Sequence, residues 1–104
     1  MSQERLQALE ALLQQDPNNA FVRYGLAQAL AAGGRYEESV AAYRELIARN
    51  PDYAAAYYHG GQTLEKLGQT DQARAIYEEG IVACTRKGDM HTRSEIQAAL
   101  DMLG

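Results

Sequence analysis

The chain has 104 residues, of which 46% are hydrophobic, and its ten basic and fourteen acidic side chains give a net charge of −4. A domain of this length buries about two-thirds of the surface of its unfolded chain, so the composition favours one folded domain and argues against global disorder. The acidic balance also argues against sequence-independent nucleic-acid binding and against docking to anionic lipid, because both need a basic face. We therefore expect neither nucleic acid nor a membrane as a partner.

The first segment, residues 1–17, predicts a helix that ends at Asp16-Pro17. Four leucines recur at helical spacing along one face of it: Leu6, Leu9, Leu12 and Leu13. The segment has Gln and Glu where a signal peptide needs a basic end and an unbroken apolar run. No later segment approaches the roughly 18 apolar residues that span a bilayer. We expect a cytoplasmic protein.

Two helical hairpins are predicted next, the first with helices over about residues 19–32 and 36–49. Asn18 or Asn19 is placed to cap the first helix, and Gly33-Gly34 supplies the left-handed turn that ends it. The short connection between the two helices makes them antiparallel.

The second hairpin begins with a helix that Asp52 is placed to cap and that ends at Gly68, followed by a helix over about residues 70–83. The lone Cys84 excludes an internal disulfide and is expected to be a small buried thiol. After Lys87-Gly88, a final helix is indicated by apolar spacing: Ile96, Ala99, Leu100 and Leu103. No alternating runs of β-branched residues predict strands, so the fold class is all-α.

An internal repeat connects these elements. When 20–53 is laid over 54–87, the two segments align without a gap, so that Tyr24 meets Tyr58 and Gln28 meets Gln62. We expect a single domain, 1–104, in four parts: an N-terminal helix at 1–17, repeats at 20–53 and 54–87, and a C-terminal capping helix at 88–104.

The repeat resembles the tetratricopeptide repeat (TPR) family, whose unit carries an aromatic, a small pair and a large apolar residue on its first helix, then a small residue and an aromatic on the second. The residues that match in the second unit are Tyr57, Gly60-Gly61, Leu64, Ala73 and Tyr77. We expect Tyr77 and its counterpart Tyr43, on the second helices, to lie in the core. The resemblance implies antiparallel helix-turn-helix repeats stacked as a short right-handed superhelix. Two departures stand out: Arg23 replaces an aromatic, and Thr85 replaces the closing proline, which would let the preceding helix run on towards Arg86 and leaves the register of the last helix open.

The helix after Asp52 has two faces of different chemistry. Tyr57, Gly60, Gly61 and Leu64 share a face built for packing, since each glycine costs about 1 kcal/mol of helix propensity that only close contact repays. The resemblance implies that the other face lines a concave groove that binds a partner. Carried over from both repeats, the groove residues are Phe21, Tyr24, Gln28, Tyr58, His59, Gln62, Glu65 and Lys66. Tyr and Gln rows suit an extended backbone or a helix face, although the tyrosines could simply close the inner surface.

One subclass of the family grips the C-terminal carboxylate of chaperones through a clamp of Lys, Asn and Arg. That clamp is not matched here, because Tyr24, Gln28 and His59 stand at three of its places, and Arg93 would add a cation only if the last helix keeps register. We expect no enzyme activity, cofactor or metal: His59 has no nucleophile or carboxylate partner, and His59 with His91 lacks a third ligand. The sequence thus predicts a non-enzymatic module that binds a protein or peptide, with an adapter or assembly role. The alternative is structural self-association as a homodimer through exposed apolar residues such as Met90 or Met102.

Overall fold

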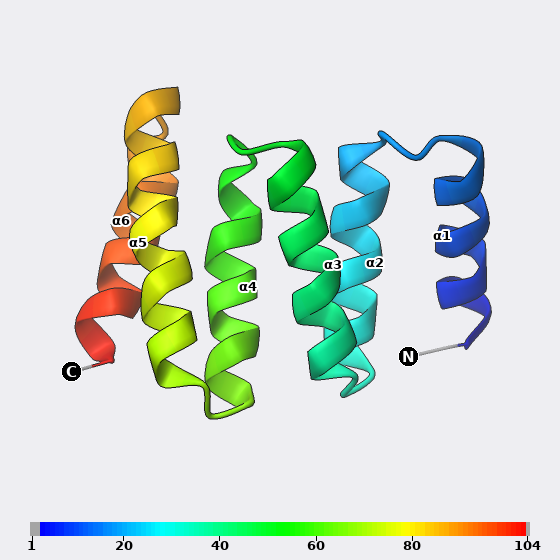
Figure 1. The fold of residues 1–104 in the computed structure, drawn as a ribbon, viewed down its shortest axis with the longest axis horizontal. Helices are drawn as coiled ribbons and strands as arrows, with labels where there is room; N and C mark the ends of the chain where they lie inside the picture. Colours follow the sequence, from blue (N-terminus) through cyan, green and yellow to red (C-terminus); the bar gives the residue numbers. More distant parts are fainter. Residues whose placement is uncertain (1–2, 104) are drawn as a thin grey trace.

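The computed structural model describes residues 3–103 and is all-α, with no strand in that range. Its helices follow one another in a row (Figure 1). Their bounds are α1 Gln3–Gln15, α2 Ala20–Ala32, α3 Tyr36–Arg49, α4 Ala54–Lys66, α5 Thr70–Lys87 and α6 Met90–Met102. Successive helices run antiparallel, as short turns require and as predicted. No helix within residues 3–103 is long and apolar enough to cross a membrane.

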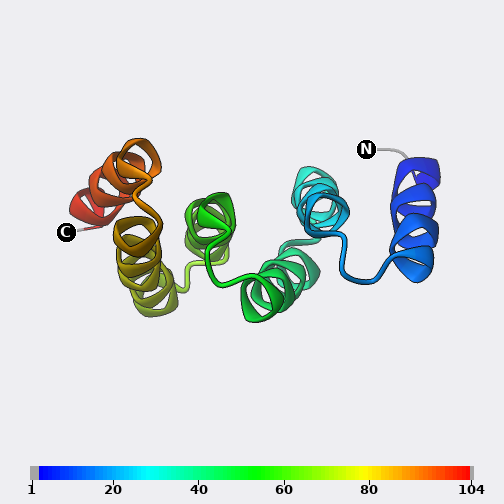
Figure 2. The ribbon, with the colours of Figure 1, turned by 90° about the horizontal axis from the view of Figure 1, so that it is seen from above.

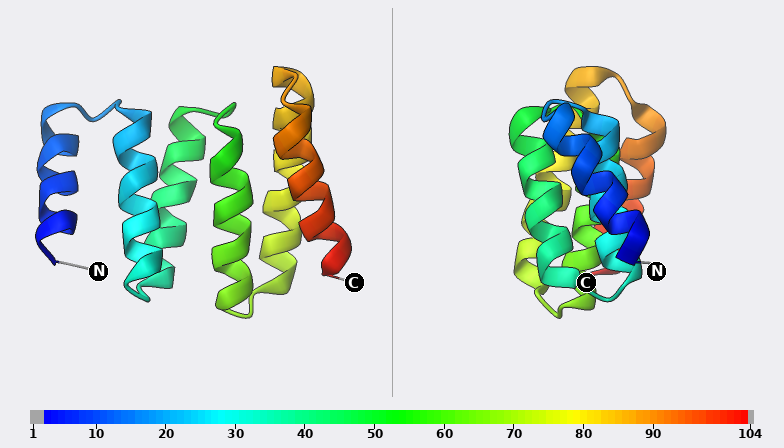
Figure 3. Two further views of the ribbon diagram at one scale, coloured as in Figure 1. Left: turned by 180° about the vertical axis from the view of Figure 1, so that it is seen from behind. Right: turned by 90° about the vertical axis from the view of Figure 1, so that its right-hand side faces the viewer.

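From α2 onwards the helices form two layers, seen from above in Figure 2, with α1 at the end of the array. We call α2, α4 and α6 the inner layer and α3 and α5 the outer layer. Within the described residues, the backbone of α2 lies close to that of α4 and α4 close to α6, whereas the backbones of α3 and α5 lie further apart and are linked by side chains, as where the Nη2 of Arg44 donates to the Oε1 of Gln72 at 3.1 Å. The stack is therefore more closely spaced along its inner layer, and Figure 3 shows its flat outline from behind and from one end.

The predicted helix caps were right at α2 and wrong at α4. Asn19 caps α2, with its side-chain oxygen accepting from the backbone N–H of Val22 at 3.1 Å. Gly34 ends the hairpin's first helix with φ +79°, a conformation that only glycine adopts without strain. Asp52 does not cap α4, because its carboxylate instead forms a 2.6 Å ion pair with Arg86 of α5.

The structure explains the departure at Arg23. Arg23 and Tyr57 occupy equivalent places in the two repeats. The hydroxyl of Tyr57 donates to the carbonyl of Pro51 at 2.5 Å, and the Nε of Arg23 donates to the carbonyl of Pro17 at 2.8 Å. Each side chain thus donates a hydrogen bond to the carbonyl of the proline that precedes its helix. The arginine therefore replaces the aromatic ring without losing that bond.

Helix α5 is longer than α3, its counterpart in the first repeat, because Thr85 stands where the first repeat has its closing proline. It continues to Lys87 and stops at Gly88, whose φ is +84°. The repeat spacing that relates α2 to α4 would start α6 at Gly88, but α6 starts at Met90 instead. This shift resolves the register of α6. Arg93 takes the place of Tyr57 and donates to the Thr85 hydroxyl at 3.0 Å, so the register on which its suggested role depended is not kept.

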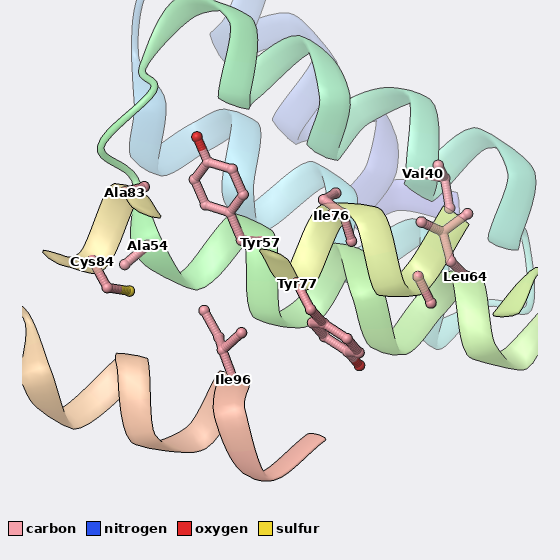
Figure 4. Close-up of a cluster of buried hydrophobic side chains, with 10 residues drawn as sticks. Val40, Ala54, Tyr57, Leu64, Ile76, Tyr77, Ala83, Cys84 and Ile96 are labelled. Carbon is pink, nitrogen blue, oxygen red and sulfur yellow. The ribbon is translucent and has the colours of Figure 1, made fainter. Parts of the chain in front are cut away.

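The core is built by aromatic rings packed on glycines. Figure 4 shows one buried cluster that draws side chains from α3 to α6, including Tyr57, Tyr77 and Ile96. The Tyr77 ring lies directly on Gly61, where an added Cβ would stand 2.1 Å from a ring carbon. Tyr77 and Cys84 are fully buried, as predicted.

The α1 end of the array corrects one prediction. Leu6 is buried against α2, but Leu12 is 50% exposed rather than part of the buried face. Its equivalent in α3, Leu46, is fully buried between α2 and α4. The difference follows because, within the described residues, α1 packs on α2 alone, so no helix covers its other side.

Candidate functional site

The eight residues predicted for the groove all lie on the inner layer and all are at least partly accessible to solvent. Helix α2 supplies three and helix α4 supplies five: Phe21, Tyr24, Gln28, and Tyr58, His59, Gln62, Glu65, Lys66. The packing face of α4 is buried by contrast, with Tyr57, Gly60, Gly61 and Leu64 all below the surface. The 3.6-residue period of the helix therefore separates a core face from an inner face, as predicted.

An aromatic cluster occupies the amino-terminal halves of α2 and α4. His59 contacts both tyrosines of the repeat, with ring centres 5.8 Å from Tyr24 and 5.1 Å from Tyr58. Tyr53 adds a fourth ring, with its centre 5.4 Å from that of Tyr24. Burial, and secondarily the neighbouring Tyr53, raises the pKa of Tyr24, which therefore stays a neutral donor and acceptor. Rings at these separations and tilted angles hold one another in place, which presents a rigid amphipathic surface.

Phe21 is the most exposed member of this surface. It lies one turn before Tyr24 on α2 and is 77% exposed, more than any other large aromatic side chain in the described range. Transfer of such a ring out of water is favourable, so its exposure is the strongest local signal for a docking contact.

Polar groups follow the aromatic cluster along both helices. The Nε2 of Gln28 donates to the Tyr24 hydroxyl at 3.1 Å, and the amide oxygen of this exposed side chain is a further acceptor. Further along α4, a shallow hollow of about 400 Å³ is lined by Gln62, Glu65 and Lys66. The inner layer thus changes from aromatic to amide to charged chemistry in the direction of the carboxyl end of α4.

Glu65 is held by a residue of the core. The buried Tyr77 of α5 reaches across Gly61 and donates its hydroxyl proton to the Oε2 of Glu65. Burial, and then this hydrogen bond, raises the pKa of Tyr77, so the hydroxyl stays a donor. The neighbouring Lys66 extends away, with its Nζ 5.8 Å from the ring centre of Tyr36 on α3.

Sequence reasoning missed two contributors, Tyr53 and Tyr77. Tyr53 precedes its helix, and its counterparts at the repeat spacing, Asn19 and Lys87, are not aromatic, so the repeat gave no signal for it. Tyr77 was assigned to the core alone, and only the glycine at position 61 hinted that its ring could reach Glu65.

The two histidines are not together. His59 lies in the aromatic cluster, while His91 is 3.8 Å from Glu95 on α6. Among residues 3–103 no group of three His, Cys, Asp or Glu side chains could hold a metal ion.

Comparisons with known proteins agree with this geometry. The sequence model of a family described as Tetratricopeptide repeat matches residues 6–49 and 24–87. The TPR repeat-containing protein PA0015 of Pseudomonas aeruginosa is 24% identical over 98 residues, which cover 94% of this chain and 93% of that protein.

Solved structures show the same arrangement of helices. A tetratricopeptide repeat domain protein from Salinibacter ruber, solved in solution by NMR, is 35% identical with a TM-score of 0.79, over 85% of this chain and 89% of that one. PcrH, crystallised in complex with the chaperone binding region of PopD, has a TM-score of 0.88 over 96% of this chain and 76% of that one, at 17% identity. The second likeness is one of fold alone.

Proposed function

The chain belongs to the tetratricopeptide repeat family, and from that premise we propose that it is a non-enzymatic module that binds a peptide or helical segment of a partner protein on its inner layer. The role is that of an adapter or assembly factor. No cofactor or metal takes part in the proposed function. We propose further that residues 1–104 act as one such domain, with repeats at 20–53 and 54–87, in the cytoplasm.

The observation that carries this proposal is the exposed ring of Phe21, one helical turn before Tyr24, whose own ring packs against that of His59. Rigid aromatic side chains provide large contact area at little cost in side-chain entropy, which is why they dominate binding hot spots. PcrH, a protein of the same fold, forms a complex with a segment of another protein, and this supports a similar kind of partner here.

The test uses a phage-displayed library of random dodecapeptides selected on the immobilised full chain. The affinities of recovered peptides are then measured for Phe21→Ala, Tyr24→Ala and Tyr58→Ala. Loss of an aromatic anchor is expected to weaken binding about tenfold or more, with helicity unchanged. The matched control is Val82→Ala, which removes a 61% exposed apolar side chain from the outer helix α5. Equal effects of Phe21→Ala and Val82→Ala would place the contact elsewhere.

A second candidate function is self-association as a homodimer. It is favoured by Met102, which is 86% exposed, and by Met90, which is half exposed. Sedimentation at several concentrations decides the point, since a strict monomer at high concentration removes this candidate.

Extension of the array end to end is disfavoured. At the repeat spacing Arg5 takes the place of Ser39, which is fully buried where α3 packs on α2 and donates its hydroxyl proton to the Ala27 carbonyl. At the other end, in the shifted register of α6, Gln97 takes the place of Gly61, on which the Tyr77 ring lies. Large polar side chains at these two positions oppose the stacking of a further helix.

A further inference from the structure

Glu65 has a carboxylate with one oxygen held by a hydrogen bond and the other able to accept a further donor. Its Oε2 accepts the proton of the buried Tyr77 hydroxyl, which fixes the side chain along the inner face of α4. Among residues 3–103, no donor reaches its Oε1. A carboxylate whose position is already fixed loses less side-chain entropy when it accepts a charged donor than a freely rotating one does.

Among the described residues, no cation forms an ion pair with Glu65. Lys66 is the adjacent residue, but its ammonium group lies over the Tyr36 ring of α3 instead. In the shifted register of α6, the residue at the place of Glu65 is Asp101, which is exposed and accepts from the Nε2 of Gln97. The carboxyl end of the inner layer is therefore acidic on two neighbouring helices, in a chain whose net charge is −4.

The spacing between the aromatic cluster and Glu65 constrains the partner. Tyr58 and Glu65 are seven residues apart on one helix face, which separates them by about 10 Å along the axis at 1.5 Å per residue. Gln62 lies between them with a side chain that can both donate and accept. Such an amide matches an extended backbone, whose N–H and C=O groups are free, better than a helix, whose groups are already paired. A polyproline II segment advances about 9 Å in three residues and returns to the same face.

We propose that the inner layer selects an extended segment that places an apolar side chain on the aromatic cluster and, three residues away, a Lys or Arg on Glu65. The inference rests on the proposed function and adds its specificity: the apolar side chain contacts Tyr24, Tyr58 and His59, and the cation binds Oε1 of Glu65. An acidic residue at the second position is repelled by Glu65 and Asp101.

The experiment is a charge swap. The phage-displayed dodecapeptide library is selected in parallel on the wild-type chain, on Glu65→Lys and on the matched control Glu78→Lys, which makes the same change at an exposed position of α5. Peptides from the wild type are expected to be enriched in Lys or Arg three residues from an apolar residue, in either order. Glu65→Lys is expected to replace that basic residue by Asp or Glu, and Glu78→Lys is expected to leave it unchanged. For a recovered peptide, Glu65→Gln, which keeps an acceptor for Tyr77, is expected to weaken binding about fivefold.

The outcomes separate this inference from the function on which it rests. Peptides that need Phe21 and Tyr24 but show no basic preference, or the same preference on Glu65→Lys, overturn the charge inference and leave the binding surface in place. A basic preference that Glu78→Lys removes equally would mean that overall charge alone attracts the peptides, and this also overturns it. No enrichment on the wild type over blank resin contradicts the proposed function itself. Circular dichroism of each variant shows that the fold is kept.

Discussion

The same substitution at two helical glycines should change the stability in opposite directions. Gly25 in α2 and Gly61 in α4 both lie inside helices with ordinary helical φ, so alanine gains about 0.5–1 kcal/mol of helix propensity at either position. They differ in what the added methyl group meets. At Gly25 the nearest atom is a Leu9 methyl carbon at 3.6 Å, which is an ordinary contact. Gly25→Ala is therefore expected to stabilise the chain by about 0.5–1 kcal/mol.

At Gly61 the methyl group would stand 2.1, 2.5 and 2.6 Å from three carbons of the Tyr77 ring. The ring cannot turn aside easily, because Tyr77 is fully buried and its hydroxyl is bonded to Glu65. Overpacking typically costs about 1–3 kcal/mol and occasionally more, and loss of all the contacts of a buried aromatic ring costs about 3–5 kcal/mol. After the propensity gain is subtracted, Gly61→Ala is expected to destabilise the chain by about 2 kcal/mol or more.

Urea titration followed by circular dichroism measures both changes at 25 °C, and thermal melting should show the Gly61→Ala midpoint lower by roughly 10 °C. The double variant Gly61→Ala with Tyr77→Leu is the control for mechanism. Because removal of the ring removes the clash, the two changes together should cost less than their sum. A Gly61→Ala chain at least as stable as the wild type would refute the packing account.

Further predictions concern caps and titration. Asp89 caps α6 by accepting from the Thr92 backbone N–H, so Asp89→Ala should lower the free energy of unfolding by about 1 kcal/mol. Asp52→Ala removes an exposed ion pair but no cap, so it should cost about 0.5 kcal/mol or less. Equal losses for the two variants in urea titrations would contradict this. Burial raises the pKa of Tyr43 and Tyr77, so the folded state holds their protons more tightly than the unfolded state does. This contribution is complete below about pH 10, the ordinary tyrosine pKa, and is lost as the pH rises further, so urea midpoints should start to fall above about pH 10, and Tyr77→Phe should flatten the fall.

The fold could be predicted from the sequence because every level of the pattern agreed. The gapless internal repeat, the glycine turns and the helical spacing of apolar residues all indicated the same hairpins, and family resemblance supplied the stacking. The errors occurred where tertiary contacts decide the outcome. Asp52 has the chemistry of a helix cap, but Arg86 on the following helix takes its carboxylate. The exposure of Leu12 depends on which helices pack beside α1, and no local pattern records that.

The candidate site was predicted only in outline. Periodicity placed Tyr24, Tyr58 and Gln62 on one layer, but it could not show that the ring next to Tyr24 is His59 rather than Tyr58. The bond between Tyr77 and Glu65 depends on the backbone approach that glycine permits at position 61, a distance of tertiary structure. Contacts between helices depend on the tertiary structure, whereas the faces of a single helix can be read from the sequence.

The most direct test of the account is an NMR titration of the ¹⁵N-labelled chain with a peptide recovered from the wild-type selection. The account predicts that chemical shifts change mainly along the inner faces of α2 and α4, at the amides of Phe21, Tyr24, Gln28, His59 and Gln62. Changes concentrated on α3 and α5, or at the exposed ends of α1 and α6, would contradict the claim that the inner layer binds the partner.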